Sequence, residues 1–333
     1  MIYDCFSFFN ELDLLEIRLN VLKDVVDRFV LVEATRTHTG KEKPLYYREN
    51  AARFSAFADR IVHVVVDDFS LADTLSDVRE KAWAIENLQR NAIVRGLAGA
   101  QADDCILISD LDEIPDPAAV ARAVALPGVT RLGMRLYNYY LNYRNYSTRQ
   151  WNLGTQVLRY GDFVDPALYA GFVFEEFVVE GVNTVPSASM VRFLKPRRML
   201  KDAGWHFSYL GGVEAVKNKI RSIAHTEFDN GTTTTDDWIN ARIAAGEDLF
   251  RRGDRFFADP VDFCLPAHIK INQEKYRHLL FDVDETYLSS TKLPRVFAGM
   301  KGLFVRFAAK MVPARLIPLA IRLRDKMHGV DRV

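Results

Sequence analysis

Two acidic residues separated by a single position follow an apolar, strand-like run. The run Cys105–Ser109 leads directly into Asp110 and Asp112, and Pro115 ends the segment. Because residues two apart in extended backbone project to the same side, we expect the two carboxylates on one face. Neighbouring carboxylates repel each other, and a divalent cation removes that conflict. The motif therefore predicts a site for Mg²⁺ or Mn²⁺, hard cations that bind carboxylates together with substrate phosphates.

The same acids have a structural alternative. Aspartates close to a proline are frequent in turns and at helix N-termini, so an isolated Asp-x-Asp pattern gives only weak support for a metal. Its position after the fourth strand of an alternating α/β segment favours the metal, because ligands of such sheets bind outside the carboxyl ends of the strands. There a cation can bridge a pyrophosphate and stabilise a departing diphosphate.

The first third of the chain alternates strand-like and helix-like segments. Contiguous apolar residues, as in Val30–Val32, are typical of parallel strands buried on both faces. The order predicts an α/β fold with a mostly parallel sheet and helices on both of its faces. The expected strands are Ile2–Phe9, Arg28–Glu33, Arg60–Val66 and Cys105–Ser109, and the expected helices are a segment near residues 12–22, Arg48–Phe57 and Asp77–Leu97.

The rest of the chain changes character twice. Between Thr130 and Asp202, short alternating runs rich in Tyr, Phe and Val predict antiparallel strands and loops that cover the active face. Helices are then expected at Val213–Ala224 and Asp236–Phe250, the second with Thr235 as its N-cap. We expect one catalytic domain over residues 1–291, with a nucleotide-binding half (1–115) and an acceptor-side half (116–291), followed by a helical, basic tail over residues 292–333.

The tail carries an unusual charge. Between Lys292 and Lys326, nine basic residues stand against the single acid Asp325. Apolar residues recur there at steps of three and four, and Pro313 and Pro318 divide the segment into two short helices. This pattern predicts an amphipathic segment lying on an anionic membrane surface. The alternative is an apolar face packed on the catalytic domain.

Composition limits the class of protein. Hydrophobic residues make up 49% of the chain and charged residues 26%, which is typical of a folded globular protein. The balance of 44 basic and 44 acidic residues gives no reason to expect nucleic acid as a partner. Cys5, Cys105 and Cys264 lie far apart in the sequence, without the spacing of metal ligands or of a Cys-x-x-Cys pair. This predicts free thiols in a reducing compartment. The sequence shows neither signal-peptide features nor an apolar run of about 18 residues, so we expect a cytoplasmic protein, soluble or peripheral on the membrane.

Four stretches of the chain resemble a known family. SDLDEIP (Ser109–Pro115) and AGWHFSYLGG (Ala203–Gly212) carry the resemblance, with weaker support from LVEATRTHTG (Leu31–Gly40) and ENLQRN (Glu86–Asn91). In these stretches, and over about residues 2–281, the chain is similar to glycosyltransferase family 17, the family of the bisecting β-1,4-N-acetylglucosaminyltransferase.

The resemblance implies a fold and a reaction. It implies a GT-A type fold, a UDP-sugar donor of the UDP-N-acetylglucosamine kind, Mn²⁺ or Mg²⁺, and inversion at the anomeric carbon. Animal members carry an N-terminal membrane anchor and act on N-glycans, whereas in this chain the resemblance begins at residue 2. We therefore expect a different carbohydrate acceptor, such as a lipid-linked or surface-polysaccharide precursor.

Several residues near the expected strand ends are candidates for donor binding. Glu33 ends the second strand, where it would accept a hydrogen bond from uracil or ribose, and Thr35 lies in the following loop. The alternative for Glu33 is a bond to nearby loop amides. On the expected long helix, Asn87 and Arg90 face the donor, with the Arg90 guanidinium suited to a diphosphate or ribose. The alternative for Arg90 is an ion pair with Glu86 one turn away.

The GWHFS stretch supplies two further candidates. His206 is expected as a third metal ligand beside Asp110 and Asp112, and the alternative is a structural histidine. Trp205 is expected to stack on a sugar of the donor, and the alternative is core packing. Both follow Gly204, which permits a close backbone approach.

Inversion requires a general base that takes the proton of the acceptor hydroxyl. Glu175 and Glu176 lie in an aromatic setting that would raise a carboxylate pKa, and only one of two adjacent strand residues can face the site. Glu227 is the rival, and Asp162 and Asp165 are secondary candidates.

These observations predict an inverting, metal-dependent glycosyltransferase. Two other classes remain open at this point. A nucleotidyltransferase or phosphohydrolase would use the same acids on a phosphate, and a non-catalytic carbohydrate-binding protein would keep the fold without turnover.

Overall fold

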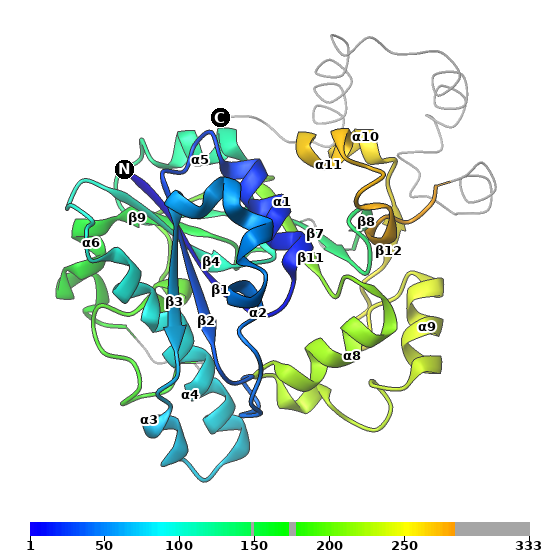
Figure 1. Cartoon of the computed structure of the whole chain (residues 1–333), viewed down its shortest axis with the longest axis horizontal. Helices are drawn as coiled ribbons and strands as arrows, with labels where there is room; N and C mark the ends of the chain where they lie inside the picture. The colour runs from blue at the N-terminus through cyan, green and yellow to red at the C-terminus, as the bar shows by residue number, and fades with distance from the viewer. Residues whose placement is uncertain (148–149, 173–177, 284–333) are drawn as a thin grey trace. The chain divides into compact units, whose positions relative to one another are not determined.

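The computed structural model describes residues 1–147, 150–172 and 178–283, and the chain divides into two units, Met1–Asp282 and Val283–Val333. The first unit is built on two β-sheets with helices packed against them (Figure 1). The predicted α/β class is confirmed. Among the described residues, none of the helices has both the length and the apolar character that crossing a membrane requires.

The larger sheet contains the four strands predicted from the first third of the chain. Its strand order is β10-β6-β9-β4-β1-β2-β3. The four strands β4, β1, β2 and β3 all run parallel to one another. Strand β9 is antiparallel to both β4 and β6, so the sheet as a whole is mixed. The bounds are β1 (Ile2–Phe8), β2 (Arg28–Ala34), β3 (Ile61–Val66), β4 (Cys105–Asp110), β6 (Thr130–Leu132), β9 (Gln156–Arg159) and β10 (Arg198–Leu200).

Alternate residues of the central strands enter two separate cores. Phe6 and Phe8 of β1 pack with the buried leucines of α1 (Leu12–Leu22), whereas Tyr3 and Cys5 pack with Trp83 and its neighbours from α4 (Val78–Asn91). This period of two follows from the pleat, because successive side chains of a strand project to opposite faces. Helices therefore cover both faces of the central strands, as predicted.

The second sheet carries the GWHFS stretch to the acidic motif. Its order is β12-β8-β7-β11-β5. Strand β11 (Gly204–Ser208) runs antiparallel to β5 (Glu113–Pro115), with His206 opposite Glu113. A Cβ on Gly204 would lie 2.4 Å from the carbonyl oxygen of Ile114, so only glycine allows this pairing. The remaining strands are β7 (Arg135–Asn138), β8 (Tyr143–Asn145) and β12 (Phe256–Ala258).

Several predicted helices differ from the observed ones. The segment Arg48–Phe57 forms α2 (Tyr46–Glu49) and the 3₁₀ helix η1 (Ala51–Arg60) instead of one α-helix. Helix α4 ends at Asn91, and the 3₁₀ helix η2 (Ala92–Leu97) follows it. Helix α9 (Asp236–Ala245) stops before Gly246, whose left-handed φ of 64° ends it. Thr235 occupies the N-cap position of α9, but its side chain makes no capping hydrogen bond.

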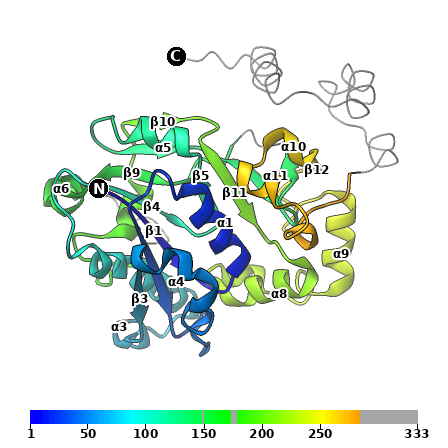
Figure 2. The same ribbon diagram turned by 45° about the horizontal axis from the view of Figure 1, so that its top comes forward.

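The segment Thr130–Asp202 contains helices as well as the predicted strands. Helix α7 (Ala188–Phe193) is the important addition, because it packs on α4 and β4. Helix α8 (Gly212–Ser222) follows β11 directly and confirms the helix predicted there (Figure 2). The other helices are α3 (Ser70–Asp73), α5 (Pro117–Ala123), α6 (Tyr160–Val164), η3 (Pro166–Tyr169), η4 (Thr226–Phe228), α10 (Val261–Cys264), α11 (Ala267–Ile271) and η5 (Arg277–Leu279).

Candidate functional site

The acidic motif lies at the carboxyl end of β4, but its two aspartates do not share one strand. Strand β4 ends at Asp110, and the backbone turns through Leu111 and Asp112 before β5 starts at Glu113. The expectation of two carboxylates on one face of extended backbone is therefore wrong, because the extended segment stops at the first of them. Each aspartate instead has its own set of cationic partners.

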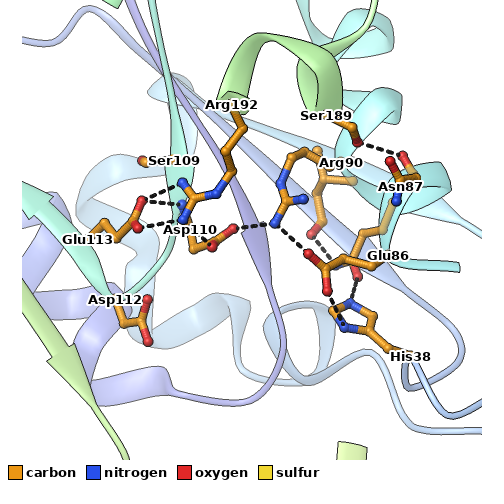
Figure 3. Close-up of polar contacts among 12 residues, drawn as sticks. His38, Glu86, Asn87, Arg90, Ser109, Asp110, Asp112, Glu113, Ser189 and Arg192 are labelled. Carbon is orange, nitrogen blue, oxygen red and sulfur yellow. Dashed lines mark hydrogen bonds and ion pairs between the residues drawn. The ribbon is translucent and has the colours of Figure 1, made fainter. Parts of the chain in front are cut away.

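Asp110 lies between two arginines from different helices (Figure 3). Its Oδ1 accepts a hydrogen bond of 2.8 Å from Arg90 of α4, and its Oδ2 lies 3.0 Å from Nη2 of Arg192 of α7. Burial alone would raise the pKa of Asp110, but the two guanidinium groups outweigh burial and hold that pKa far below its usual range. Asp110 is therefore ionised at neutral pH, with one third of its side chain exposed.

Arg192 also binds the third acid of the motif. Its two terminal nitrogens donate to the two oxygens of Glu113, at 2.7 and 2.6 Å, in the fork geometry that suits a guanidinium and a carboxylate. The indole nitrogen of Trp151 donates to the same carboxylate at 2.6 Å. Glu113 is almost completely buried, so these three hydrogen bonds satisfy a charge that water cannot reach.

Asp112 contacts a lysine and a histidine from two other elements, α8 and β11. Its Oδ2 accepts a hydrogen bond of 2.7 Å from Nζ of Lys219 of α8, and its Oδ1 lies 3.5 Å from Nε2 of His206 of β11. Burial opposes ionisation, but Lys219 and His206 together lower the pKa of Asp112 far below its usual range. The imidazole ring packs against Trp151, with 4.7 Å between ring centroids, and its buried Nδ1 has no hydrogen-bond partner among the described residues.

Arg18 holds the backbone of the acidic turn, and sequence reasoning missed it. Its Nη1 donates to the main-chain carbonyls of Asp110, Leu111 and Glu113, at 2.9, 3.0 and 2.8 Å. Its Nε and Nη2 bind the two carboxylate oxygens of Asp4, at 2.8 and 2.6 Å. The available signal was a lone arginine in the apolar helical repeat of α1, but its partners lie on other elements and are invisible in sequence.

Arg90 also makes the pairing that was the alternative for this residue, through the same nitrogen that binds Asp110. Nη2 of Arg90 donates to Glu86 one turn earlier, at 2.8 Å, and Glu86 in turn lies 3.4 Å from His38. The guanidinium thus bridges Glu86 and Asp110. Asn87 points away from this bridge, because its amide donates to the carbonyl of Trp83 and accepts from Asn183.

Glu33 is fully buried and lies one residue before the end of β2 at Ala34, not at the strand end as predicted. Its carboxylate accepts a hydrogen bond of 3.1 Å from the amide of Tyr47, and its other oxygen lies 3.0 Å from Nε2 of His63. The bond to a loop amide is the alternative considered for Glu33, and its role toward a nucleoside stays a prediction. Thr35 lies just beyond, with its amide donating to Val66.

The remaining candidates are spread over several places. Trp205 is 6% exposed and belongs to the hydrophobic core, in line with the packing alternative.

Glu227, a candidate general base, lies on η4. Burial favours its protonated form, but a 2.7 Å contact with His225 lowers its pKa. Glu175 and Glu176 lie outside the described residues. Asp162 and Asp165 follow Arg159, which pairs with Cys105, the first residue of β4. They therefore lie toward the amino end of β4, away from Asp110 at its carboxyl end.

The residues around the turn can accept a divalent cation. The ion pairs around the turn form two groups, each with one excess negative charge when histidine is neutral. Arg90 and Arg192 join Glu86, Asp110 and Glu113, whereas Lys219 joins Glu11 and Asp112. The donor atoms of Asp112 and His206, 3.5 Å apart, fit within the span of two ligands that each lie about 2.1 Å from one Mg²⁺.

The protein alone offers few ligands for such an ion. Within the described ranges, no three His, Cys, Asp or Glu side chains come together as a metal-binding group. Asp112 and His206 would therefore hold the ion together with oxygens of a substrate, as Mg²⁺ sites with one or two protein ligands do. Asp110, whose oxygens are engaged by Arg90 and Arg192, remains a predicted ligand.

Comparison with known proteins supports the resemblance noted in the sequence. Residues 1–163 match the model of Glycosyltransferase family 17. The β-1,4-mannosyl-glycoprotein 4-β-N-acetylglucosaminyltransferases of Homo sapiens and Rattus norvegicus are each 32% identical to this chain over 112 residues, and that of Mus musculus is 31% identical. The resemblance to this family is thus confirmed for the segment that contains Arg90, Asp110 and Asp112.

The similarity covers a limited part of each chain. The aligned region is 32% of this chain and 20% of each relative, so the match spans about a fifth of the length of these curated relatives. Arg192, His206 and Lys219, which pair with the acids of the motif, all lie beyond residue 163. The predicted resemblance of the Ala203–Gly212 stretch stays a prediction.

Proposed function

We propose that this chain, whose first 163 residues match glycosyltransferase family 17, is an inverting glycosyltransferase with a GT-A type fold. The proposed reaction moves a sugar, N-acetylglucosamine in the first instance, from a UDP-sugar to a carbohydrate acceptor. The observation that carries the proposal is the acidic turn at the carboxyl end of β4, where Asp110 and Asp112 are held by cationic groups from α4, α7 and α8. Family membership of the matched segment supports the same reaction class.

The charges of the turn support the proposed metal dependence. A diphosphate brought to the turn, beside two groups of ion pairs that each carry one excess negative charge, would be repelled, and a divalent cation reverses that balance. Asp112 and His206 are the residues proposed to hold Mn²⁺ or Mg²⁺, which when bound would stabilise the departing UDP as a Lewis acid. Arg18 keeps the turn in place for this purpose, because it binds three of its carbonyl oxygens.

The donor is proposed to lie along the carboxyl ends of the parallel strands. Ligands of open α/β sheets bind in this position, and Asp110 lies here together with Arg90, whose guanidinium suits phosphate oxygens. Glu33 and Thr35, near the carboxyl end of β2, which β1 separates from β4, are proposed to border the nucleoside. The general base that takes the acceptor proton is proposed to be one of Glu175, Glu176 and Glu227.

Product analysis after incubation with UDP-N-acetylglucosamine and Mn²⁺ tests the proposal. An inverting transferase without its acceptor releases UDP slowly, as the donor is hydrolysed by water. Release of pyrophosphate or inorganic phosphate instead would indicate a nucleotidyltransferase or phosphohydrolase that uses the same acids. Sugar binding without any turnover would indicate a carbohydrate-binding protein.

The acceptor and the cellular location are proposed together. A lipid-linked or surface-polysaccharide precursor would present a carbohydrate at the cytoplasmic face of a membrane, and the buried free thiols of Cys5 and Cys105 are consistent with a reducing compartment. The basic tail, residues 292–333, lies outside the described residues and is proposed to bind anionic lipid. Co-sedimentation with vesicles containing phosphatidylserine should therefore require the tail, decrease with salt and be lost from a chain ending at Ser290.

A further inference from the structure

Lys219 of helix α8 contacts two acidic residues, one of them in the acidic turn. Its Nζ lies 2.7 Å from Oδ2 of Asp112 and 3.6 Å from Oε1 of Glu11, which follows β1. Lys217, two positions earlier, points to the other side of α8 and pairs with Glu214 and with Asp236. The helix thus offers one lysine to the acidic turn and one to its outer surface.

The carboxylate that Lys219 holds is also the one proposed to bind the metal. Lys219 holds Oδ2, whereas the proposed metal position lies between Oδ1 and His206, so the ammonium group and a divalent cation would share one carboxylate and repel each other. A cation at Asp112 would therefore weaken the contact with Lys219 and leave Glu11, at 3.6 Å, as its acidic neighbour. A largely buried ammonium whose ion pair weakens requires another anion nearby.

The surroundings keep Lys219 in reach of such an anion. Its Nζ lies 5.6 Å from the ring centre of Tyr209, close enough for a cation–π interaction. Tyr209 adopts a left-handed backbone conformation, with φ of 54°, directly after β11. Non-glycine residues rarely adopt this conformation, and residues that do so cluster at functional sites. The lysine side chain remains 21% exposed, so a ligand can reach it.

We propose that Lys219 exchanges Asp112 for the diphosphate of the donor when metal and donor bind. This inference rests on the proposed function, since that function brings a diphosphate to the turn. Lys219 would then offset part of the negative charge on UDP both in the bound donor and after the bond to the sugar breaks. Binding of Mn²⁺ and UDP becomes mutually favourable, because each removes a cost that the other faces.

Calorimetric titration of UDP in the presence of Mn²⁺ tests this assignment on the full chain. Lys219→Met should weaken UDP binding at least about tenfold, the size expected for a lost hydrogen bond to a charged group. Uridine, which has no phosphate, should bind the variant within about twofold of its affinity for the unsubstituted protein. Lys217→Met is the matched control on the same helix and should leave the affinity for UDP unchanged, whereas Lys219→Arg, which retains the charge, should restore most of it.

The possible results separate this inference from the proposed function. If the unsubstituted protein binds no UDP, the proposed function fails and the role of Lys219 fails with it. If it binds UDP and a folded Lys219→Met binds UDP equally well, only the inference is overturned. Equal losses for UDP and uridine would also overturn it, because they indicate a general structural defect. Should Lys219→Met not fold, Lys219→Gln, which can still donate a hydrogen bond to Asp112, takes its place in the same comparison.

Discussion

Arg18 and Asp4 form a fully buried ion pair in which Nε and Nη2 of the arginine bind the two carboxylate oxygens at 2.8 and 2.6 Å. The same guanidinium binds the carbonyl oxygens of Asp110, Leu111 and Glu113 through its remaining nitrogen. The buried pair thus connects α1 and β1 to the acidic turn. Its charges are satisfied only as long as both partners are present.

Removal of Arg18 should strongly destabilise the protein. Arg18→Met leaves Asp4 as a buried, unpaired charge and removes the hydrogen bonds to the turn, which should lower the free energy of unfolding by about 3–5 kcal/mol. Urea denaturation followed by circular dichroism measures this change. Arg53→Met is the matched control, because Arg53 pairs with Asp13 and Glu16 at the surface, where an ion pair contributes about 0–1 kcal/mol. Similar, small losses for both variants would contradict the role given to Arg18.

Much of the scaffold around this pair could be predicted from sequence. The contiguous apolar residues of β2 and β4, and the position of Asp110 at the end of β4, follow from local pattern alone. The second aspartate could not be placed in the same way, because the turn at Leu111 and Asp112 depends on hydrogen bonds from Arg18 on another element. A local sequence pattern cannot show that a residue about ninety positions away will form these hydrogen bonds.

Arg90 was predicted from sequence, but the other two cations of the site, Arg192 and Lys219, escaped prediction for a related reason. Arg192 lies on α7, in a segment where alternating aromatic and apolar residues predicted strands and loops. Lys219 lies on a correctly predicted helix, but Lys217 on the same helix is equally basic, and only the tertiary structure shows which one faces Asp112. Charge in a sequence shows that an ion pair can form but leaves its partner open.

The ionised aspartates of the turn should make folding stability depend on acid. The pKa of Asp112 is lower in the folded protein than the value of about 3.9 in an unfolded chain, so its contribution is complete above that pH. As pH falls below about 4, the unfolded state takes up protons first and stability decreases, by at most about 1.4 kcal/mol per pH unit for one group.

Urea unfolding of the unsubstituted protein and of Asp112→Asn at pH 7, 5, 4 and 3 measures this effect. The variant should be less stable at pH 7, and the difference between the two proteins should shrink between pH 4 and pH 3. A difference that stays constant over the whole range would show that Asp112 has an ordinary pKa in the folded protein.

Chelation of divalent cations should stop turnover of the donor. Removal of metal by EDTA leaves the excess negative charge of the turn uncompensated, and addition of Mn²⁺ or Mg²⁺ in excess should restore UDP release. Calorimetry should in parallel show tighter UDP binding when Mn²⁺ is present. Undiminished turnover in metal-free buffer would mean that Arg90, Arg192 and Lys219 neutralise the diphosphate without a metal.

The proposed metal site is tested most directly by the rate of UDP release from UDP-N-acetylglucosamine by Asp112→Asn in saturating Mn²⁺. Asparagine keeps the shape of the side chain but removes the charge proposed to hold the metal, so the rate should fall at least about 10²-fold, as when one preorganised stabilising group is deleted. Asp116→Asn is the control, because Asp116 caps α5 through a 2.8 Å bond to the amide of Ala118, and asparagine caps helices equally well. We expect a folded, inactive Asp112→Asn beside an active Asp116→Asn. A folded Asp112→Asn that releases UDP at a near-normal rate would contradict the proposed metal site.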